Sequence, residues 1–307
     1  MGKREMELEV IAEGLWFPEG PIAVSDGSVI VVEIRRKTLT QVWPGGKRRI
    51  IAELPGGPNG AAVGPDGAIY VCNNGGAWDW MPGDVHLPGN APPVYTGGSI
   101  QRVDLTTGEV TTLYSDCEGL PLNSPNDIVF DGTGNFWFTC LGQTDGEVRR
   151  LGALYYASID GKSITRWRSG VTSPNGVGLS PDGRTVYMAD CMLGRLLAYD
   201  LSAPGVMIPN DTMAGGRVVC TLPGFQWLDS MAIEADGRIA VGTLWNGGIT
   251  VFTPAGDAEH VAFPDPVTTN ICFGGSDLRT AYVTCSSTGR LIRCSWPRSG
   301  LRLHYNL

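Results

Sequence analysis

The chain has 307 residues, of which 42% are hydrophobic, and a mean hydropathy of -0.01. It can bury a large core, and without an apolar run of bilayer length it is not expected to span a membrane. The net charge is -8, and the basic residues are dispersed apart from short clusters such as Arg35-Arg36-Lys37 and Lys47-Arg48-Arg49. Nucleic acids and acidic membrane surfaces need a broad basic face, so we expect neither as a partner.

The first residues, MGKREMELEV, lack the apolar core of a signal peptide, which predicts a cytoplasmic location. Eight cysteines follow along the chain without a Cys-x-x-Cys pair or a companion cluster of histidines. Several lie within or just after apolar, strand-like runs. We therefore expect buried, reduced thiols rather than disulfides or a zinc site.

A turn signal recurs six times along the chain, each time between an apolar run and an alternating β-type run. The six turns are Asp26-Gly27, Asp66-Gly67, Thr133-Gly134, Asp182-Gly183, Asp236-Gly237 and Asp277-Leu278. They are separated by 40, 67, 49, 54 and 41 residues, a spacing typical of four-stranded blades with loop insertions. The runs that follow, such as AIYVCN and RTVYMAD, are rich in β-branched and aromatic residues.

These repeats predict an all-β fold, a six-bladed β-propeller formed by residues 1–307 as one domain. The N-terminal run MELEVIAEGL has strand character, and the last repeat, from Asn270 to Leu307, needs a partner strand. We expect the two ends to share one blade and so close the ring.

An oxygen-bearing side chain stands seven residues before each turn. The six residues are Glu19, Asn59, Asn126, Asn175, Asp229 and Asn270. This position begins the first strand of each blade, which in a propeller lines the central channel. The repeat therefore predicts that these six side chains converge on one axis.

Carboxylate and amide oxygens without Cys or His suit a hard divalent cation such as Ca²⁺. Two buried carboxylates would also repel each other unless a positive charge lay between them. Such an ion can polarise a carbonyl or phosphoryl oxygen and hold a water beside it, with Asp229 as ligand, as general base, or as both in turn. The alternative is that the six side chains only fill the channel with hydrogen bonds.

Other catalytic arrangements have less support. His86, His260 and His304 lie outside the repeat register, so a Ser-His-Asp triad would have to come from loops. No nucleophile elbow, P-loop or dinucleotide fingerprint occurs.

The chain resembles the senescence marker protein/gluconolactonase/luciferin-regenerating enzyme family of six-bladed, metal-dependent hydrolases. Five segments carry the resemblance in order: FPEGPIAV around Glu19, LNSPNDIVFDGTGNFWFT around Asn126, SPNGVGLSPDGRTVYMAD around Asn175, LDSMAIEADG around Asp229 and NICFGGSDLRTAYVT around Asn270.

The resemblance implies that Glu19, Asn126, Asn175 and Asp229 bind one divalent metal ion, and that Asp229 acts in water activation or attack. We expect Ca²⁺, with Zn²⁺, Mg²⁺ and Mn²⁺ as alternatives. It also implies that Asn126 contacts substrate as well as metal, and that Asp127 is a substrate contact or supports the site from behind. Asn59 and Asn270 would complete the ring and hold water or substrate.

The chain departs from the family around these motifs, with Leu120-Pro121-Leu122 before the Asn-Ser-Pro-Asn-Asp run and Leu228-Asp229-Ser230 at the acid. Compared with the family, this chain therefore offers fewer polar side chains to recognise the hydroxyl groups of a sugar lactone. Aromatic residues instead crowd the segments expected near the channel mouth; the candidates for substrate contact are Trp16, Trp78, Trp80, Trp227 and Trp245. Residues 75–98 form a long Gly/Pro-rich insertion that resembles a lid more than a strand.

We therefore expect a lactonase or related esterase acting on a small molecule less polar than gluconolactone. Cleavage of a phosphotriester or fluorophosphate, a pathway-specific lyase or isomerase, and a non-enzymatic ligand-binding propeller are the alternatives. The sequence does not define the oligomeric state.

Overall fold

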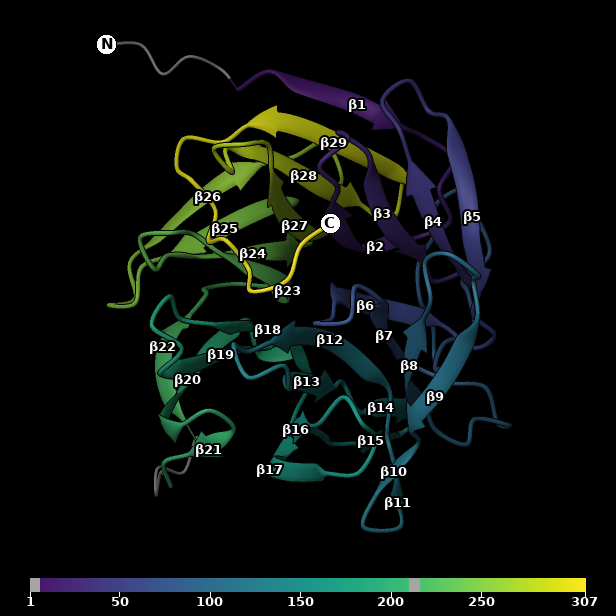
Figure 1. Ribbon diagram of the computed structural model, residues 1–307, viewed down its shortest axis with the longest axis vertical. Coiled ribbons are helices and arrows are strands. Elements are labelled where there is room, and N and C mark those ends of the chain that lie inside the picture. Colours follow the sequence, from purple (N-terminus) through teal and green to yellow (C-terminus); the bar gives the residue numbers. More distant parts are fainter. Residues whose placement is uncertain (1–5, 210–215) are drawn as a thin grey trace.

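The structure, a computed structural model, describes residues 6–209 and 216–307. Its described residues form six antiparallel sheets arranged around a central axis as the blades of a propeller (Figure 1). The prediction of an all-β, six-bladed propeller is confirmed. No helix in the two described ranges is long and apolar enough to cross a bilayer.

The strands of the first three blades follow one another along the chain. Blade 1 contains β2 (Pro18–Ala23), β3 (Val29–Glu33), β4 (Thr38–Val42) and β5 (Arg48–Glu53). Blade 2 contains β6 (Pro58–Val63), β7 (Ile69–Asn73), β8 (Ser99–Val103) and β9 (Val110–Tyr114). Blade 3 contains β12 (Pro125–Phe130), β13 (Phe136–Cys140), β16 (Gly152–Ala157) and β17 (Ile164–Val171).

The second half of the ring has the same plan. Blade 4 contains β18 (Pro174–Leu179), β19 (Thr185–Asp190), β20 (Arg195–Ala203), β21 (Val206–Met207) and β22 (Arg217–Thr221), with the short helix η1 (Cys191–Leu193) before β20. Blade 5 contains β23 (Trp227–Ile233), β24 (Ile239–Leu244), β25 (Gly248–Phe252) and β26 (Ala258–Ala262). Blade 6 contains β27 (Thr268–Gly274), β28 (Thr280–Cys285), β29 (Arg290–Ser295) and β1 (Leu8–Ala12).

Two small hairpins project from the loops between blades and within blade 3. They are β10 (Asp116–Cys117) with β11 (Leu120–Pro121), and β14 (Gln143–Asp145) with β15 (Val148–Arg150).

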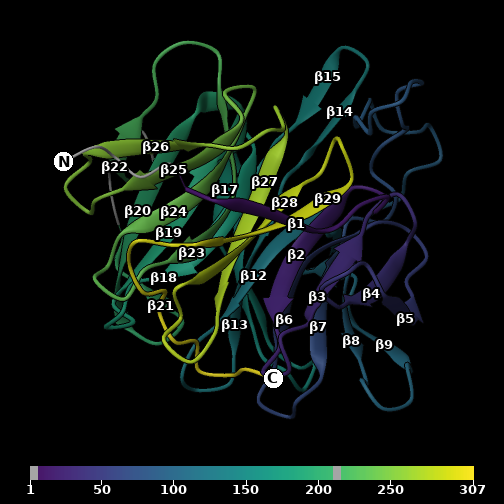
Figure 2. The same cartoon turned by 90° about the horizontal axis from the view of Figure 1, so that it is seen from above.

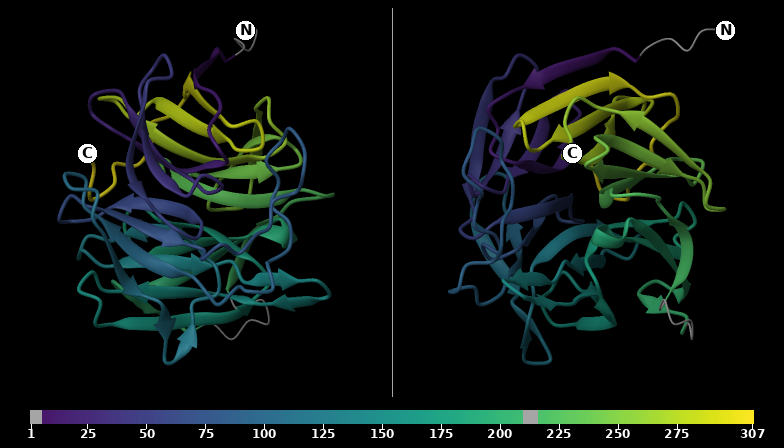
Figure 3. Two further views of the ribbon diagram at one scale, coloured as in Figure 1. Left: turned by 90° about the vertical axis from the view of Figure 1, so that its right-hand side faces the viewer. Right: turned by 180° about the vertical axis from the view of Figure 1, so that it is seen from behind.

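The N-terminal strand closes the ring. Strand β1 pairs antiparallel with β29, with Leu8 opposite Cys294 and Val10 opposite Ile292. Figure 3 shows β1 beside the last strands of the chain. The expectation that the two ends share one blade is therefore correct, and the sheet formed by the last repeat gains the fourth strand that it lacked.

The six sequence turns all connect the first and second strands of their blades. Gly27 has φ +84°, as a tight turn requires, and Leu278 at the equivalent place in blade 6 has φ +56°. A leucine in the left-handed region is strained, so the fold of blade 6 outweighs the local preference of this residue.

The first strand of each blade lies innermost. Strand β2 contacts β6, β6 contacts β12, and the series continues through β18 and β23 to β27, which contacts β2 again. In Figure 1 these strands surround the axis, and Figure 2 shows the β14–β15 hairpin and the C-terminus at opposite ends of the molecule.

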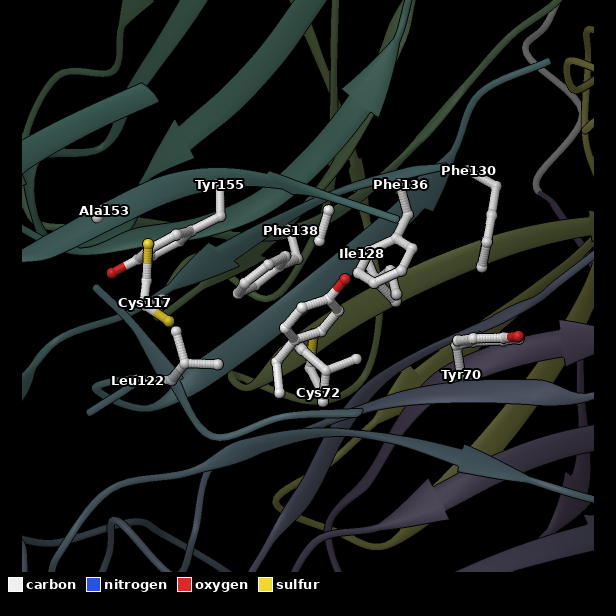
Figure 4. Close-up of a cluster of buried hydrophobic side chains, with 14 of the residues drawn as sticks. Tyr70, Cys72, Cys117, Leu122, Ile128, Phe130, Phe136, Phe138, Ala153 and Tyr155 are labelled. Carbon is white, nitrogen blue, oxygen red and sulfur yellow. The ribbon is translucent and has the colours of Figure 1, made fainter. Parts of the chain in front are cut away.

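The core lies mainly between neighbouring blades. Figure 4 shows the cluster between blades 2 and 3, where Tyr70 and Cys72 of β7 pack near Phe136 and Phe138 of β13. Five similar clusters occur in the described residues. Because each blade buries apolar side chains against its neighbours, the ring holds the inner strands in fixed relative positions.

Candidate active site

The six oxygen-bearing residues of the sequence repeat occupy equivalent places in the ring. Each is the second or third residue of an inner strand: Glu19 on β2, Asn59 on β6, Asn126 on β12, Asn175 on β18, Asp229 on β23 and Asn270 on β27. All six are buried, with 8% or less of their surface exposed. We call this set the axial ring.

A β-bulge falls at the axial ring in every blade. The register between β2 and β3 breaks after Glu19, and the register between β27 and β28 breaks just before Asn270. The other four inner strands break within the same few residues. A bulge adds one residue and re-aims the side chain beside it, so the local distortion recurs where each blade presents its oxygen atom.

Glycines bring neighbouring blades close together at the ring. A Cβ on Gly60 would lie 2.4 Å from the carbonyl oxygen of Asn126, and a Cβ on Gly176 would lie 2.5 Å from that of Asp229. Both distances are shorter than any real contact, so only glycine permits this approach. The sequence repeat gave no hint of this pairing between blades.

Hydrogen bonds orient two side chains of the ring. Asn270 Nδ2 donates to Glu19 Oε2 at 2.8 Å, and the backbone N–H of Gly20 donates to the same oxygen at 2.6 Å. On the next side of the ring, Ser230 Oγ donates to Asn175 Oδ1 at 3.4 Å. Asn270 therefore orients the carboxylate of Glu19, and Ser230 orients the amide of Asn175.

The two carboxylates of the ring affect each other's ionisation. Burial raises the pKa of Glu19 to about 7, although hydrogen bonds from Asn270 and Gly20 partly offset it. Burial, followed by the negative charge of Glu19, raises the pKa of Asp229 well above its usual range, against a hydrogen bond from Asn175. Both groups thus lie close enough to repel, and without a cation they favour a protonated state.

The ring residues fit a divalent cation. Asn126 Oδ1 is buried and accepts no hydrogen bond, and Asn59 Nδ2 is buried without an acceptor. Two repelling carboxylates and an unpartnered amide oxygen are the hard oxygen donors that Ca²⁺ prefers. The described residues hold no group of three or more His, Cys, Asp or Glu side chains in metal-binding proximity, so a metal site here depends on amide ligands.

Asp127 differs from the ring in its contacts. Its Oδ1 accepts the backbone N–H of Ile128 at 3.0 Å, and its Oδ2 accepts that of Val177 at 3.1 Å. Burial, and then the charge of Glu19, raises the pKa of Asp127 to about 8. This carboxyl group therefore joins blades 3 and 4 just beside the ring, and its oxygens are already engaged by the backbone.

Aromatic side chains gather where β2 begins. Phe17, two residues before Glu19, lies 5.2 Å from Trp80 between ring centroids, and Trp80 meets Trp78 edge-on at 6.3 Å. Trp16 lies on the more exposed side, with the Arg36 guanidinium 4.7 Å from its centroid. The predicted contacts Trp16, Trp78 and Trp80 thus share one neighbourhood, and Phe17 belongs to it although the sequence did not single it out as a substrate contact.

A second aromatic group lies at blade 5. Trp227 and Trp245 meet at 5.8 Å, and the exposed Phe225 stacks on Trp245 at 6.0 Å. Trp227, Trp78 and Trp80 all pack against the apolar cluster that contains Phe17. The two groups therefore border the same side of the molecule, the side on which the inner strands begin.

Residues 75–98 reach blades 3 and 6 on this side. The backbone N–H of His86 donates to Ser287 of blade 6, that of Ala91 donates to Thr144 in the β14–β15 hairpin, and that of Ser124 donates to Tyr95 Oη. The insertion thus passes along the rim of the channel mouth, with contacts to residues far away in sequence.

On the other side of the ring, a cavity of about 610 Å³ follows the channel axis. Its walls are mostly apolar side chains of the inner strands, and the segment from Leu301 to Asn306 lies over it. The backbone N–H of Leu301 donates to Ile233, and that of Ser25 donates to Leu307, so the C-terminal segment is tied across this mouth. The cavity reaches the axial ring at Asn270 and is also lined by Asp127.

Similarity to known proteins extends over most of the chain. Residues 17–287 match the family described as SMP-30/Gluconolactonase/LRE-like region. A gluconolactonase from Zymomonas mobilis is 25% identical over 305 residues, covering 91% of this chain and 79% of that protein.

Two solved structures share the fold. A gluconolactonase from Xanthomonas campestris superposes with a TM-score of 0.74 at 20% identity, over 95% of this chain and 90% of that chain. A calcium-binding regucalcin from Agrobacterium tumefaciens superposes with a TM-score of 0.73 at 20% identity, over 97% and 98%. These likenesses cover nearly the whole of each chain.

Proposed function

This chain belongs to the SMP-30/gluconolactonase/LRE-like family, and on that premise we propose that it is a lactone hydrolase using one divalent metal ion. The ion, which we propose to be Ca²⁺, is held by Glu19, Asn126, Asn175 and Asp229. The lactone-hydrolase assignment follows from the family and from the gluconolactonase relative. A cytoplasmic location and a small-molecule substrate belong to the same proposal.

The observation that carries the metal site is the electrostatics of the axial ring. Glu19 and Asp229 are buried, which raises the pKa of both, and the charge of Glu19 raises the pKa of Asp229 further. Asn126 Oδ1 has no hydrogen-bond donor beside them. A calcium-binding protein of the same fold adds support. When bound, a divalent cation supplies polarisation of the substrate carbonyl and a lowered pKa of a neighbouring water.

The chain's own residues carry out the proton transfers. Asp229 takes a proton from the attacking water as the water oxygen bonds to the carbonyl carbon. The bond from that carbon to the ring oxygen then breaks, and the leaving oxygen takes the proton back from Asp229. The product is a hydroxycarboxylic acid, which loses its proton to solvent, and Asp229 returns to its starting state.

The remaining ring residues position these groups. Asn270 holds Glu19 through its amide N–H, and Ser230 holds Asn175 through its hydroxyl. Asn59 offers a buried Nδ2 with no acceptor, which suits contact with water or substrate. Asp127 supports the site through the backbone of its neighbours.

The aromatic rim favours a substrate less polar than a sugar lactone. Phe17, Trp78, Trp80 and Trp227 border the side of the molecule on which the inner strands begin. Rings of this kind bind apolar or aromatic surface and offer few donors for hydroxyl groups.

The test is a panel of aromatic, alkyl and sugar lactones, assayed with added Ca²⁺, with chelator, and after Ca²⁺ is restored. The proposal predicts hydrolysis that chelator removes and Ca²⁺ restores, fastest on the less polar lactones. A phosphotriester and a fluorophosphate in the same panel test the nearest alternative, which is a hydrolase that acts on phosphorus esters instead of lactones. A protein that binds the ion but turns over none of these compounds would be a binding propeller, contrary to the proposal.

A further inference from the structure

A second pocket, of about 250 Å³, lies at the aromatic rim between blade 1, blade 2 and the insertion. We call it the rim pocket. Its walls include Arg35, Lys37, Asn74, Trp78 and Trp80. The volume suits one substituent of a ligand rather than a whole drug-sized molecule.

The rim pocket lies beside the axial ring. Its wall includes Gly57, which stands two residues before Asn59. Two residues of extended chain span about 7 Å, so the backbone of Asn59 lies within about that distance of the pocket wall. The backbone N–H of Ile34, another wall residue, donates to Phe17, which stands two residues before Glu19.

Asn74 presents an unused donor at the pocket. It is 1% exposed, and its Oδ1 accepts the backbone N–H groups of Gly76 at 2.9 Å and Ala77 at 3.2 Å. Its Nδ2 is buried and has no acceptor. A buried amide N–H without a partner costs free energy, which a ligand oxygen would recover.

Contacts with neighbouring side chains hold the guanidinium of Arg35 in place at the rim pocket. Its guanidinium lies 5.8 Å from the centroid of Trp16 and 5.5 Å from that of Trp80. Its Nη1 lies 2.6 Å from His86 Nδ1. Since a guanidinium can only donate, His86 accepts here and is neutral, in keeping with a pKa lowered by burial and by the charges of Arg35 and Arg36.

The charges of the rim pocket are not neutralised by the protein. Across residues 6–209 and 216–307, neither Arg35 nor Lys37 forms an ion pair, whereas the neighbouring Arg36 pairs with Glu33 at 2.8 Å. Asp79 is the one carboxylate of the lining, and it is exposed to solvent. Two cations, Asn74 and two indole rings thus line a space whose one carboxylate is the exposed Asp79.

We propose that the rim pocket binds a carboxylate on the substrate, with Arg35 and Asn74 as its donors and Trp78 and Trp80 against the carbon skeleton. The inference rests on the proposed function for its reaction and defines the substrate class further: an aromatic or apolar lactone that carries a carboxylate away from the reacting ester. Arg35 is a specificity residue, because a planar fork of N–H groups matches carboxylate geometry.

The first test measures binding without turnover. Benzoate and its neutral isostere benzamide are titrated against the protein, with tryptophan fluorescence and calorimetry as readouts. The proposal predicts that benzoate binds more tightly, and that Arg35→Gln and Asn74→Asp each weaken it by about tenfold or more, as expected for charge-assisted hydrogen bonds. Asn74→Asp keeps an oxygen that accepts the N–H groups of Gly76 and Ala77, and it replaces the free N–H donor with a negatively charged oxygen.

Lys47→Gln is the control for the binding test. It removes an exposed lysine of blade 1, the blade of Arg35, and should leave benzoate binding unchanged.

The second test compares dihydrocoumarin with a dihydrocoumarin that carries a carboxylate. Arg35→Gln should raise KM about tenfold for the carboxylate lactone and by much less for the neutral lactone. Equal affinity for benzoate and benzamide in the unsubstituted protein, or equal losses on both lactones, would overturn the inference while leaving lactone hydrolysis intact. Benzoate binding that depends on Arg35 and Asn74, in a protein that hydrolyses no lactone, would instead reject the proposed function and retain the pocket.

Discussion

Asn270 donates its Nδ2 hydrogen to Glu19 Oε2 at 2.8 Å, across 251 residues of chain. The bond joins the first strand of the last blade to the first strand of the first blade. Closure of the ring by β1 places the two strands side by side, so the fold and the candidate metal ligand depend on the same junction. Groups that hold a ligand carboxylate in this way control both its orientation and its basicity.

Asn270→Ala removes this donor and leaves the rest of the ring in place. We expect the affinity for Ca²⁺ to fall by about 10- to 100-fold, the usual cost of losing a group that orients a metal ligand. Calorimetric titration of the chelated protein measures the change. Asn135→Ala, in a turn remote from the ring, serves as the matched control and should bind Ca²⁺ normally. Equal affinities in all three proteins would show that Asn270 does not support a metal ligand.

Asp229→Asn keeps the size of the side chain and removes the proposed base. Lactone turnover should fall by about 100-fold or more, within the range supplied by general-base catalysis. The melting temperature of the chelated protein should not fall, because the change deletes a carboxyl group whose ionised form is disfavoured by burial and by Glu19. Asp257→Asn, on the exposed surface, is the control. Full turnover in Asp229→Asn would remove this residue from the mechanism.

The stability of the chelated protein should depend on pH in a defined direction. Folding raises the pKa of Glu19 from 4.5 to about 7 and that of Asp127 from 3.8 to about 8. Between these limits the folded chain binds more protons than the unfolded chain, so this stabilisation is complete below about pH 4 and is lost as pH rises through about 7 to 8. Thermal melts with chelator at pH 6 and pH 8.5 should give the lower melting temperature at pH 8.5.

Two further melts complete this test. Glu19→Gln removes one of the titrating groups and should reduce the difference between the two pH values. Saturating Ca²⁺ should stabilise the protein more at pH 8.5 than at pH 6, because protons and the ion compete for the same oxygens. A chelated protein that is more stable at pH 8.5 would contradict the account of the buried carboxyl groups.

Gly176→Ala should disturb the junction of blades 4 and 5. The new methyl group would lie 2.5 Å from the carbonyl oxygen of Asp229, and backbone cannot move aside cheaply. We expect a loss of about 1–3 kcal/mol in the free energy of unfolding, with weaker Ca²⁺ binding. Gly178→Ala, two residues along the same strand, meets only the ends of Ile233 and Met231 and is the control. Urea denaturation measures both, and equal losses would show that the close approach at Gly176 has no special role.

The sequence predicted the features that repeat from blade to blade. Each turn such as Asp182-Gly183 lies between the first two strands of its blade, and each residue seven positions earlier, such as Asn175, lies buried at the start of an inner strand. These features are local, since a turn and the strand beside it depend on a few consecutive residues. The sequence also predicted that the two chain ends share one blade, because the last repeat lacked one strand and the N-terminal run could supply it.

Contacts between loops of different blades could not be predicted in this way. Arg35 and His86 meet over 51 residues, and neither belongs to the repeat. The basic cluster at Arg35-Arg36-Lys37 was visible in the sequence, but only the structure shows that Arg36 forms an ion pair with Glu33 whereas Arg35 contacts His86. Likewise, no periodicity marks Gly60 and Gly176 as the sites where blades approach, because the constraint comes from the neighbouring backbone.

The central claim is that the axial ring holds one divalent ion through Glu19, Asn126, Asn175 and Asp229. The most direct measurement is the metal content of the chelated protein after equilibration with Ca²⁺ and removal of free ion, determined by elemental analysis alongside Glu19→Gln. The account predicts one Ca²⁺ per chain in the unsubstituted protein and a large loss in Glu19→Gln. No bound ion under these conditions, or the same content in both proteins, would contradict it.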